Sequence, residues 1–364
     1  MKTILVKAYA HMNLGDDLFI KMLCERYKET KFYLFATERY TKVDGFRLDN
    51  LTIEYNNSLY KKILTRIGRA FNIPNILEDR CAKSVDGVVN IGGSIFIEND
   101  FSQEDLNIRV RNLENGKNYF ILGSNFGPYK TESFKETYNK FFKECRDVCF
   151  RDTKSYELFK ELENVRVGQD IVFSLDEEKI EPSETKGYNL ISVILPSRRK
   201  GLERSEGEYF QRLKDIVIES VKAGERVKLI SFCEDEGDEL AIDKLLSMIP
   251  NEYGRNISKY FYKGDINEAL RVIKGAKRVI ATRFHAMILG FVFKKPVFPI
   301  CYNEKMENVL KDLDFKGNYV YIDKVSKLTY DRVIENESLD EKTLLEAVSG
   351  GEKQFQGLDE FLEN

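Results

Sequence analysis

Short apolar segments alternate with stretches of helical periodicity along almost the whole sequence. The short segments are rich in β-branched and aromatic residues, as buried strands are, and the stretches between them repeat apolar residues every three or four positions, as amphipathic helices do. Strands that alternate with helices form parallel sheets covered by helices, so we expect an α/β protein. The expected strands are residues 4–8, 32–36, 85–91, 119–123, 148–150, 190–195, 227–232, 279–282 and 297–300, and the expected helices are residues 17–27, 133–145, 208–222 and 266–274.

A polar stretch without periodicity interrupts the alternation at residues 176–186. The chain has 364 residues, which exceeds the size at which a single hydrophobic core stops growing. We therefore expect two Rossmann-like domains, residues 1–175 and 187–335, which are joined by a linker and face each other across a cleft. Residues 336–364 are charged and helical in pattern, and we expect them to form a tail that can pack back on the first domain.

The charge balance and the cysteines argue against several classes of protein. Lys and Arg number 57 against 60 Asp and Glu, a formal net charge of −3, so the chain lacks the basic excess that favours nucleic acid. No apolar run is long enough for a membrane helix, and the start does not resemble a signal peptide, so we expect a cytoplasmic protein. The six cysteines are scattered without a Cys-x-x-Cys pair, which favours buried free thiols over disulfides or a metal site.

Parallel sheets bind ligands beyond the carboxyl ends of their strands, so the residues that follow each strand are the site candidates. In the first domain the glycines permit tight turns and leave backbone N–H groups open to ligand oxygens, and the acids can cap a helix or accept hydroxyl hydrogen bonds. An ordinary strand-to-helix turn explains each segment equally well, and no glycine segment fits a Walker loop or a full dinucleotide fingerprint. These candidates are Asn13, Gly15, Asp16, Asp17, Gly92, Gly93 and Ser94.

The sharpest signal lies at the end of the expected strand 279–282. Arg283 and His285 follow this strand, and alternation puts both side chains on one side of the turn that opens an apolar helix. A guanidinium supplies fixed positive charge for an anionic substrate, and an imidazole can move protons near neutral pH. We therefore predict that Arg283 and His285 are catalytic. The alternative is a hydrogen-bonded structural histidine at a helix start.

Further cations follow expected strands and are candidates for binding the same anion. Arg151 can clamp a carboxylate or phosphate through two parallel hydrogen bonds, or it can tie its domain together through an ion pair. Lys305, and Arg198 or Arg199, lie at strand exits in the second domain. The acidic run at residues 234–238 is interpreted as the first turn of a helix.

In combination and in this order, these segments resemble the polysaccharide pyruvyl transferase family over most of the chain. The shared elements are Asn13-x-Gly15-Asp16-Asp17, Gly92-Gly93, Gly127-Pro128, Arg151-Asp152-x-x-Ser155, Asp170-x-x-Phe173, Thr282-Arg283-x-His285 and Tyr302-x-x-Lys305. The sequence departs from the family pattern at Ser94, at residues 196–197 and at Lys294, where glycine is usual. The second departure leaves open whether Arg198 or Arg199 corresponds to the family's arginine.

The resemblance implies a GT-B-like architecture and the transfer of pyruvate from phosphoenolpyruvate to sugar hydroxyls of a cell-surface polysaccharide precursor, as for capsule or exopolysaccharide. The products would be a pyruvate ketal and phosphate. On this interpretation His285 is the acid and base, and Arg283, Arg151, Lys305 and one of Arg198 or Arg199 bind the donor. The candidates of the first domain would hold the acceptor, a sugar or a lipid-linked oligosaccharide at the membrane. No metal is expected, and no cofactor beyond phosphoenolpyruvate as co-substrate.

Two other functions stay open at this point. A nucleotide-sugar glycosyltransferase of the same architecture would use Arg283 to hold a diphosphate, and it would release a nucleoside phosphate in place of inorganic phosphate. A catalytically silent member would bind glycan or assist an assembly complex.

Overall fold

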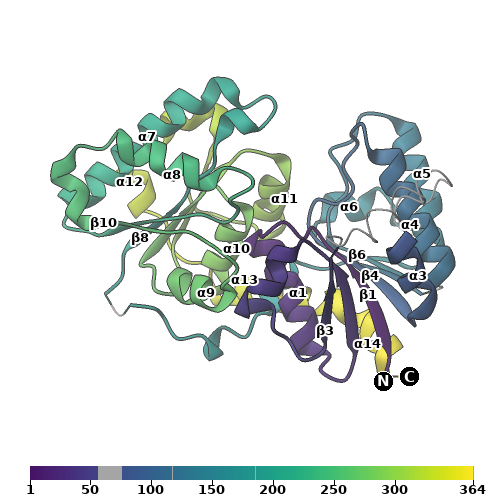
Figure 1. Ribbon diagram of the computed structural model, residues 1–364. Coiled ribbons are helices and arrows are strands. Elements are labelled where there is room, and N and C mark those ends of the chain that lie inside the picture. The colour runs from purple at the N-terminus through teal and green to yellow at the C-terminus, as the bar shows by residue number, and fades with distance from the viewer. Residues whose placement is uncertain (56–75, 117, 185, 364) are drawn as a thin grey trace. The chain divides into compact units, whose positions relative to one another are not determined.

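The computed structural model describes residues 1–55, 76–116, 118–184 and 186–363 (Figure 1). Residues 56–75 and 117 of the first expected domain, residue 185 of the expected linker and residue 364 of the expected tail lie outside the described residues. The chain divides into two compact units. Unit 1 comprises Met1–His11, Asp16–Ser174 and Val348–Asn364, and unit 2 comprises Met12–Gly15 and Leu175–Ala347.

Unit 1 contains a parallel sheet with the strand order β3-β2-β1-β4-β5-β6-β7. Its strands are β1 (Thr3–Lys7), β2 (Lys31–Phe35), β3 (Leu51–Glu54), β4 (Gly87–Ile91), β5 (Tyr119–Ser124), β6 (Asp147–Phe150) and β7 (Val165–Val167). The strand order changes direction at β1, whose neighbours are β2 and β4. The carboxyl ends of β1 and β4 therefore border the position at which doubly wound sheets bind ligands.

Helices cover both faces of this sheet (Figure 1). Tyr119 and Ile121 of β5 pack on one face, in an aromatic-rich core that includes residues of α3, α4 and α5. Phe120, which points to the other face because side chains alternate along a strand, contacts the ring of Phe361 in α14 with centroids 5.2 Å apart. The helices are α1 (Leu14–Arg26), α3 (Ile76–Ser84), α4 (Ser102–Gly116), α5 (Glu132–Glu144), α6 (Thr153–Glu157) and α14 (Gln356–Glu363).

The end of the chain is tied into unit 1 by the fully buried side chain of Gln354. Its amide oxygen accepts a hydrogen bond of 2.8 Å from the N–H of Gly123, and its amide nitrogen donates to the carbonyl oxygens of Phe150 and Gln169 at 3.2 and 2.8 Å. Residues far apart in sequence thus satisfy one another's buried polar groups.

Unit 2 contains a second parallel sheet, with the strand order β10-β9-β8-β11-β12-β13. Its strands are β8 (Asn189–Ser192), β9 (Val227–Ile230), β10 (Ile257–Tyr260), β11 (Arg278–Ala281), β12 (Val297–Cys301) and β13 (Val320–Tyr321). The order changes direction at β8, which lies between β9 and β11. Residues that follow β8, β9 and β11 therefore meet at one edge of this sheet.

The helices of unit 2 lie on both faces of its sheet, with α7 and α8 on one face and α9 and α10 on the other (Figure 1). Leu213 and Val217 of α7 and Leu245 of α8 pack with Ile191 and Leu229 of the sheet. The helices are α7 (Glu206–Lys222), α8 (Asp238–Ser247), α9 (Ile266–Lys274), α10 (Phe284–Val292), α11 (Glu304–Asp312), α12 (Tyr330–Ile334) and α13 (Glu341–Glu352), of which α13 ends in unit 1.

The expected α/β class is confirmed, and each expected strand is present with slightly different ends. Four further strands, β3, β7, β10 and β13, lie at the outer edges of the two sheets. The six cysteines are free thiols, and all but Cys81 are buried. Lys294, at the position where the family has glycine, adopts a positive φ of 55° after α10, which explains why glycine suits this turn.

The stretch at residues 176–186 is anchored within unit 2 where the structure describes it. Glu177 accepts hydrogen bonds from Lys274 at 2.7 Å and from Lys294 at 2.9 Å. These ion pairs lower the pKa of Glu177. The polar composition of this stretch thus reflects ion pairs with α9 and with the turn after α10.

Candidate functional site

The end of β11 is fixed by hydrogen bonds to the neighbouring strand. The hydroxyl oxygen of Ser192, the last residue of β8, accepts hydrogen bonds from the backbone N–H groups of Thr282 and Arg283 at 3.0 and 3.1 Å. The hydroxyl groups of Thr282 and Tyr209 lie 3.0 Å apart. These buried contacts determine where Arg283 leaves the sheet and where α10 begins.

Arg283 is buried and lies between two carboxylates. Its Nε donates to Asp238 at 2.9 Å, and its Nη2 donates to the other oxygen of the same carboxylate. Its Nη1 donates to Glu236. Burial alone would lower the pKa of Arg283, but Asp238 and Glu236 raise the pKa well above its ordinary range. The guanidinium is therefore permanently charged and oriented by Asp238.

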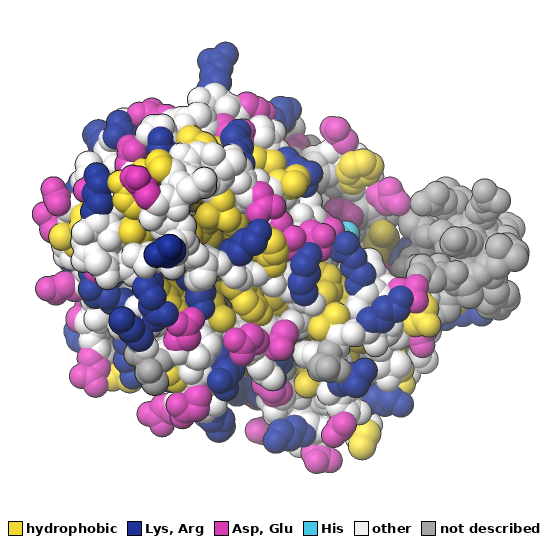
Figure 2. Space-filling model, turned by 60° about the vertical axis from the view of Figure 1, so that its left-hand side comes forward, with side chains coloured by type: hydrophobic (Ala, Val, Ile, Leu, Met, Phe, Trp, Pro, Cys, Tyr) yellow, Lys and Arg dark blue, Asp and Glu magenta, His cyan; other side chains and the backbone are white. Residues whose placement is uncertain are grey.

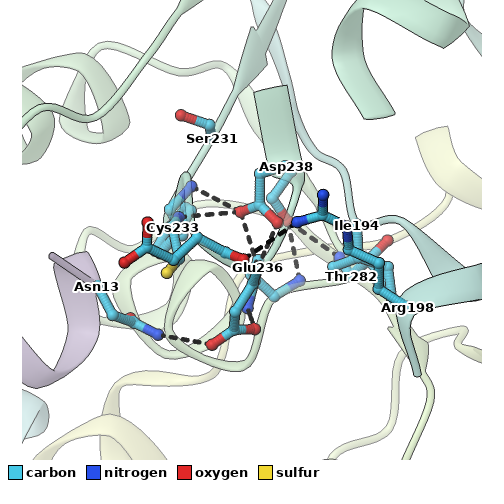
Figure 3. Close-up of polar contacts among 12 residues, drawn as sticks. Asn13, Ile194, Arg198, Ser231, Cys233, Glu236, Asp238 and Thr282 are labelled. Carbon is cyan, nitrogen blue, oxygen red and sulfur yellow. Dashed lines mark hydrogen bonds and ion pairs between the residues drawn. The ribbon is translucent and has the colours of Figure 1, made fainter. Parts of the chain in front are cut away.

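Glu236 is shared by two arginines and an asparagine (Figure 3). Arg199 donates to the oxygen that Arg283 also contacts, and the side-chain amide of Asn13 donates to the other oxygen at 3.3 Å. Burial opposes ionisation, but the two arginines lower the pKa of Glu236 to about 2. The Glu236 side chain is 26% exposed, whereas Asp238 is fully buried. Of the two carboxylates, Glu236 is therefore the accessible one.

The structure separates the two arginines that the sequence left open. Arg199 shares Glu236 with Arg283, whereas Arg198 is exposed and donates to the backbone carbonyl of Asp235 at 3.1 Å. Arg199 is therefore the one of the two that joins the Arg283 cluster.

His285 is the one residue of α10 that is not buried. Its imidazole lies against the segment Met12–Gly15, because a Cβ atom built on Gly15 would come within 1.7 Å of the His285 Nδ1. The segment is held in unit 2 by a hydrogen bond of 3.0 Å from the Leu14 N–H to the carbonyl of Phe232. Gly15 is required here because any side chain would displace the imidazole.

Lys305 lies near this cluster, on α11. Its Nζ is 5.3 Å from the centre of the Phe284 ring, and Phe284 and His285 contact each other with ring centroids 5.1 Å apart. Of the predicted donor-binding cations, Arg199 and Arg283 thus share Glu236, and Lys305 lies beside the ring of Phe284, next to His285, all within unit 2.

In unit 1, Arg151 follows β6 and lies in a buried polar cluster. It is 1% exposed and pairs with the fully buried Asp170 at 2.8 Å, and its Nη2 donates to the side-chain oxygen of Asn125 at 2.8 Å. Ser94 donates to the same oxygen at 3.0 Å, and a Cβ atom on Gly93 would lie 2.6 Å from the guanidinium. Gly93, Ser94 and Arg151 are thus brought together inside unit 1.

The acidic residues after β1 differ in exposure. Asp17 is fully buried and accepts a hydrogen bond of 2.6 Å from the Tyr40 hydroxyl. Asp16 is partly exposed and lies beside Gly92, since a Cβ atom built on Gly92 would be 3.9 Å from its carboxylate. Of the two acids, Asp16 is the better placed to meet a ligand.

Sequence reasoning missed the partners of Arg151 and Arg283. Asp238 does begin α8, as the acidic run predicted, but its carboxylate binds Arg283 and the backbone N–H groups of Phe232 and Cys233. Glu236 lies in the loop before the helix. The signal that could have found Glu236 and Asp238 is an acidic run after β9, which is separated by β8 alone from β11, the strand that Arg283 follows. The residues missed are Asn125, Glu236 and Asp238, and for Asp170, which belongs to a shared motif, the pairing with Arg151 was missed.

Other properties of the described residues limit the kind of site. Among them, no group of three or more His, Cys, Asp or Glu side chains is arranged to hold a metal ion. No helix in the described ranges combines the length and apolarity that crossing a membrane requires. Figure 2 shows cationic and anionic side chains interspersed over the face in view, in keeping with the formal net charge of −3.

Solved structures share this fold at low sequence identity. Anabaena Alr3699/HepE, solved in complex with UDP and glucose, matches with a TM-score of 0.59 and 12% identity over 100% of both chains. UDP-GlcNAc 2-epimerase from Neisseria meningitidis, bound to UDP-GlcNAc, has a TM-score of 0.58 and 12% identity, again over 100% of both chains. E. coli ADP-heptose lps heptosyltransferase II has a TM-score of 0.50 and 11% identity, covering 95% of this chain and 99% of that one.

The fold class is therefore that of the GT-B glycosyltransferases and epimerases, and each of the two α/β units of the chain contains a parallel sheet. Within this class, the family model of polysaccharide pyruvyl transferase matches residues 13–304, so the chain belongs to the polysaccharide pyruvyl transferase family. A curated relative, the amylovoran biosynthesis protein AmsJ of Erwinia amylovora, is 22% identical over 86% of each chain. The resemblance expected from the sequence motifs is confirmed.

Proposed function

We propose that this protein transfers pyruvate from phosphoenolpyruvate to two hydroxyls of a sugar in a polysaccharide precursor, forming a ketal and releasing phosphate. The observation that carries the proposal is that, in unit 2, Arg199 and Arg283 share Glu236 while Lys305 lies beside the Phe284 ring, next to His285. Family membership supplies the reaction class, and the named relative's role in amylovoran biosynthesis supports a polysaccharide precursor as the acceptor.

The negative charges of the donor determine which side chains we propose to bind it. Phosphoenolpyruvate carries a phosphate and a carboxylate, and paired arginines bind such groups through parallel charged hydrogen bonds. In the structure Glu236 accepts from both Arg199 and Arg283. We propose that an oxyanion of the donor takes the place of Glu236, while Asp238 continues to orient Arg283. Lys305 supplies a further positive charge.

Proton transfer is assigned to His285. Ketal formation requires a proton on C3 of the donor, so that C2 gains oxocarbenium character and is attacked by a sugar hydroxyl. The C2–O bond to phosphate then breaks, and a second hydroxyl adds at C2. His285 is partly exposed at the start of a buried helix, and its imidazole can give the first proton and recover another from a hydroxyl.

Acceptor binding is proposed for Asn13 and Asp16, which are partly exposed polar residues. Gly15, Gly92 and Gly93 contribute close backbone approach. We propose structural roles for Asp17, held by Tyr40, and for Arg151, held by Asp170, because both are buried in pairs. The acceptor is proposed to be a free or lipid-linked sugar that is modified in the cytoplasm.

A nucleotide-sugar glycosyltransferase is the second candidate, since two of the structural neighbours carry UDP or UDP-GlcNAc. The pair of Arg199, which is partly exposed, and the buried Arg283 could hold a diphosphate equally well. The two candidates differ in what leaves the donor. Pyruvyl transfer releases inorganic phosphate, whereas glycosyl transfer releases a nucleoside phosphate.

The test incubates the protein with nitrophenyl sugars and lipid-linked sugars, with either phosphoenolpyruvate or UDP-sugars and ADP-sugars as donor. We expect phosphate release and a product heavier by one pyruvate ketal with phosphoenolpyruvate alone. Product formed from a nucleotide sugar would contradict the proposal and favour the second candidate. If no donor gives product, and His285→Gln leaves polysaccharide output in cells unchanged, the protein is a silent binding member of the family.

A further inference from the structure

Tyr302 lies among the proposed donor-binding cations but has no role in the mechanism so far. It follows β12 directly and belongs to the Tyr302-x-x-Lys305 motif. The guanidinium carbon of Arg199 lies 4.8 Å from the centre of its ring. Its ring packs against the hydrophobic core of unit 2, and the residue is partly exposed. The phenol is therefore anchored in the core and oriented by Arg199.

The surroundings of this phenol are strongly cationic. Arg199, Lys305 and Arg283 act on it from the loop after β8, from α11 and from the start of α10, and the carboxylate of Glu236 opposes them from the loop before α8. Burial would raise the pKa of Tyr302, but the three cations outweigh burial and lower the pKa below its ordinary value of 10. Of the residues that the structure describes, none donates to or accepts from its hydroxyl.

The proposed reaction moves two protons. Each of the two sugar hydroxyls loses one proton; one proton ends on C3 of phosphoenolpyruvate and the other leaves with the phosphate as hydrogen phosphate. His285 can serve one of these transfers by protonating C3 and recovering a proton from a hydroxyl. A second group that is ionised beside the donor would serve the other transfer.

We propose that Tyr302 is this second proton-transfer group, an inference that rests on the proposed function. The ionised phenol accepts the proton of one sugar hydroxyl as its oxygen bonds to C2. It then donates that proton to the oxygen that departs with phosphorus as the C2–O bond to phosphate breaks. The tyrosinate is thereby restored, and no oxidant or reductant is needed.

Tyr321 provides a matched control, because it also lies at the end of a strand of the same sheet. Burial and the neighbouring Glu307 raise the pKa of Tyr321, whereas the pKa of Tyr302 is lowered, so Tyr321 ionises at a higher pH than Tyr302. Tyr321→Phe should therefore leave turnover and its pH dependence unchanged. Tyr302→Phe removes only one hydroxyl and leaves the core-anchored ring in place.

The experiment compares both variants with the wild-type protein. We expect Tyr302→Phe to lower kcat roughly 10²–10⁴-fold, with a KM for phosphoenolpyruvate within about threefold of the wild-type value. The rise of the wild-type rate with pH, as the phenol ionises, should disappear in this variant. A wild-type kcat and an unaltered pH profile in Tyr302→Phe would overturn the role of Tyr302 and leave the proposed function standing.

A titration without substrates gives a readout independent of activity. The absorbance at the tyrosinate band is measured for the wild-type protein and for Tyr302→Phe as the pH rises from neutral. The difference between the two curves should show one phenol that ionises below the ordinary tyrosine range. The corresponding difference for Tyr321→Phe should show a phenol that ionises above that range. A Tyr302 that ionises at or above the ordinary range would overturn the inference, whereas a wild-type protein that forms no ketal would overturn the proposed function itself.

Discussion

Arg151 in unit 1 and Arg283 in unit 2 look alike in sequence, since each directly follows an expected strand. Both are buried, and each pairs with a fully buried aspartate, Asp170 or Asp238. They differ in the second residue that accepts a hydrogen bond from the guanidinium. For Arg151 this acceptor is the buried Asn125. For Arg283 it is Glu236, which is partly exposed and shared with Arg199.

This contrast separates Arg151, whose proposed role is structural, from Arg283, which we propose binds the donor. Both guanidiniums have lost their water, so a buried aspartate must compensate each charge. Such an arginine can bind an anion only if the anion can replace one of the residues that accept its hydrogen bonds. A glycine packs against each cluster, Gly93 against the Arg151 guanidinium and Gly15 against the His285 imidazole. A side chain at either glycine would therefore displace a different group, the guanidinium of Arg151 or the imidazole of His285.

The largest expected effect is on stability and concerns unit 1. Arg151→Met leaves Asp170 buried without its partner, which should lower the free energy of unfolding by about 3–5 kcal/mol. Urea unfolding followed by circular dichroism measures this loss. Arg80→Met, at an exposed arginine of α3, is the control and should change stability by less than about 0.5 kcal/mol. A comparably small change in Arg151→Met would remove the structural role assigned to Arg151.

The two glycines should respond differently to the same change. In Gly15→Ala the new methyl group displaces the His285 imidazole, and a misplacement of about 1 Å can cost on the order of 10²-fold in rate. In Gly93→Ala the methyl group meets the Arg151 guanidinium, so stability should fall further than in Gly15→Ala. Gly207→Ala, in open space on α7, serves as the control for both. Wild-type turnover in Gly15→Ala would mean that this contact does not position the imidazole.

Replacing arginine by lysine tests which guanidinium binds the donor. Arg283→Lys keeps the charge but loses the fork of hydrogen bonds, so the KM for phosphoenolpyruvate should rise about tenfold or more, as expected for a lost charged hydrogen bond. Arg151→Lys should leave this KM within about twofold. Steady-state kinetics with varied donor concentration decides between them, and an equal rise in both variants would erase the distinction between the two arginines.

The smallest expected effect concerns Glu236. Glu236→Gln removes the carboxylate that competes with the donor for Arg199 and Arg283, so the KM for phosphoenolpyruvate should fall several-fold, on the order of the 1 kcal/mol of a partly exposed ion pair. An unchanged or higher KM would show that Glu236 does not occupy the donor's place.

Glu236 also links stability to pH. Its folded-state pKa of about 2 lies below the ordinary value of 4.5, so its contribution is present above pH 4.5 and is lost as the pH falls through about 2. The free energy of unfolding is measured as the pH is lowered. In Glu236→Gln it should not show the loss that the wild-type protein shows as Glu236 becomes protonated. A variant that loses stability as steeply as the wild-type protein over that range would contradict the lowered pKa.

The sequence predicts the centre of each sheet better than its edges. Central strands such as β4 and β8 are buried at every position, and so they appear as apolar runs. The edge strands β3 and β10 have no fully buried position, and they lack the pattern that marks a strand. The same logic holds at the site. Arg283 and His285 follow a recognisable strand, whereas Glu236 and Asp238 meet Arg283 only through the pairing of β8 with β9 and β11.

We propose that the Arg283 cluster serves proton transfer by His285. The most direct test measures ketal formation and phosphate release by His285→Gln at saturating phosphoenolpyruvate, with His11→Gln, the chain's other histidine, as the matched control. We expect a loss of roughly 10²–10⁴-fold in turnover with the fold intact, and wild-type turnover for His11→Gln. Ketal formed by His285→Gln at the wild-type rate would contradict the role of His285 in proton transfer.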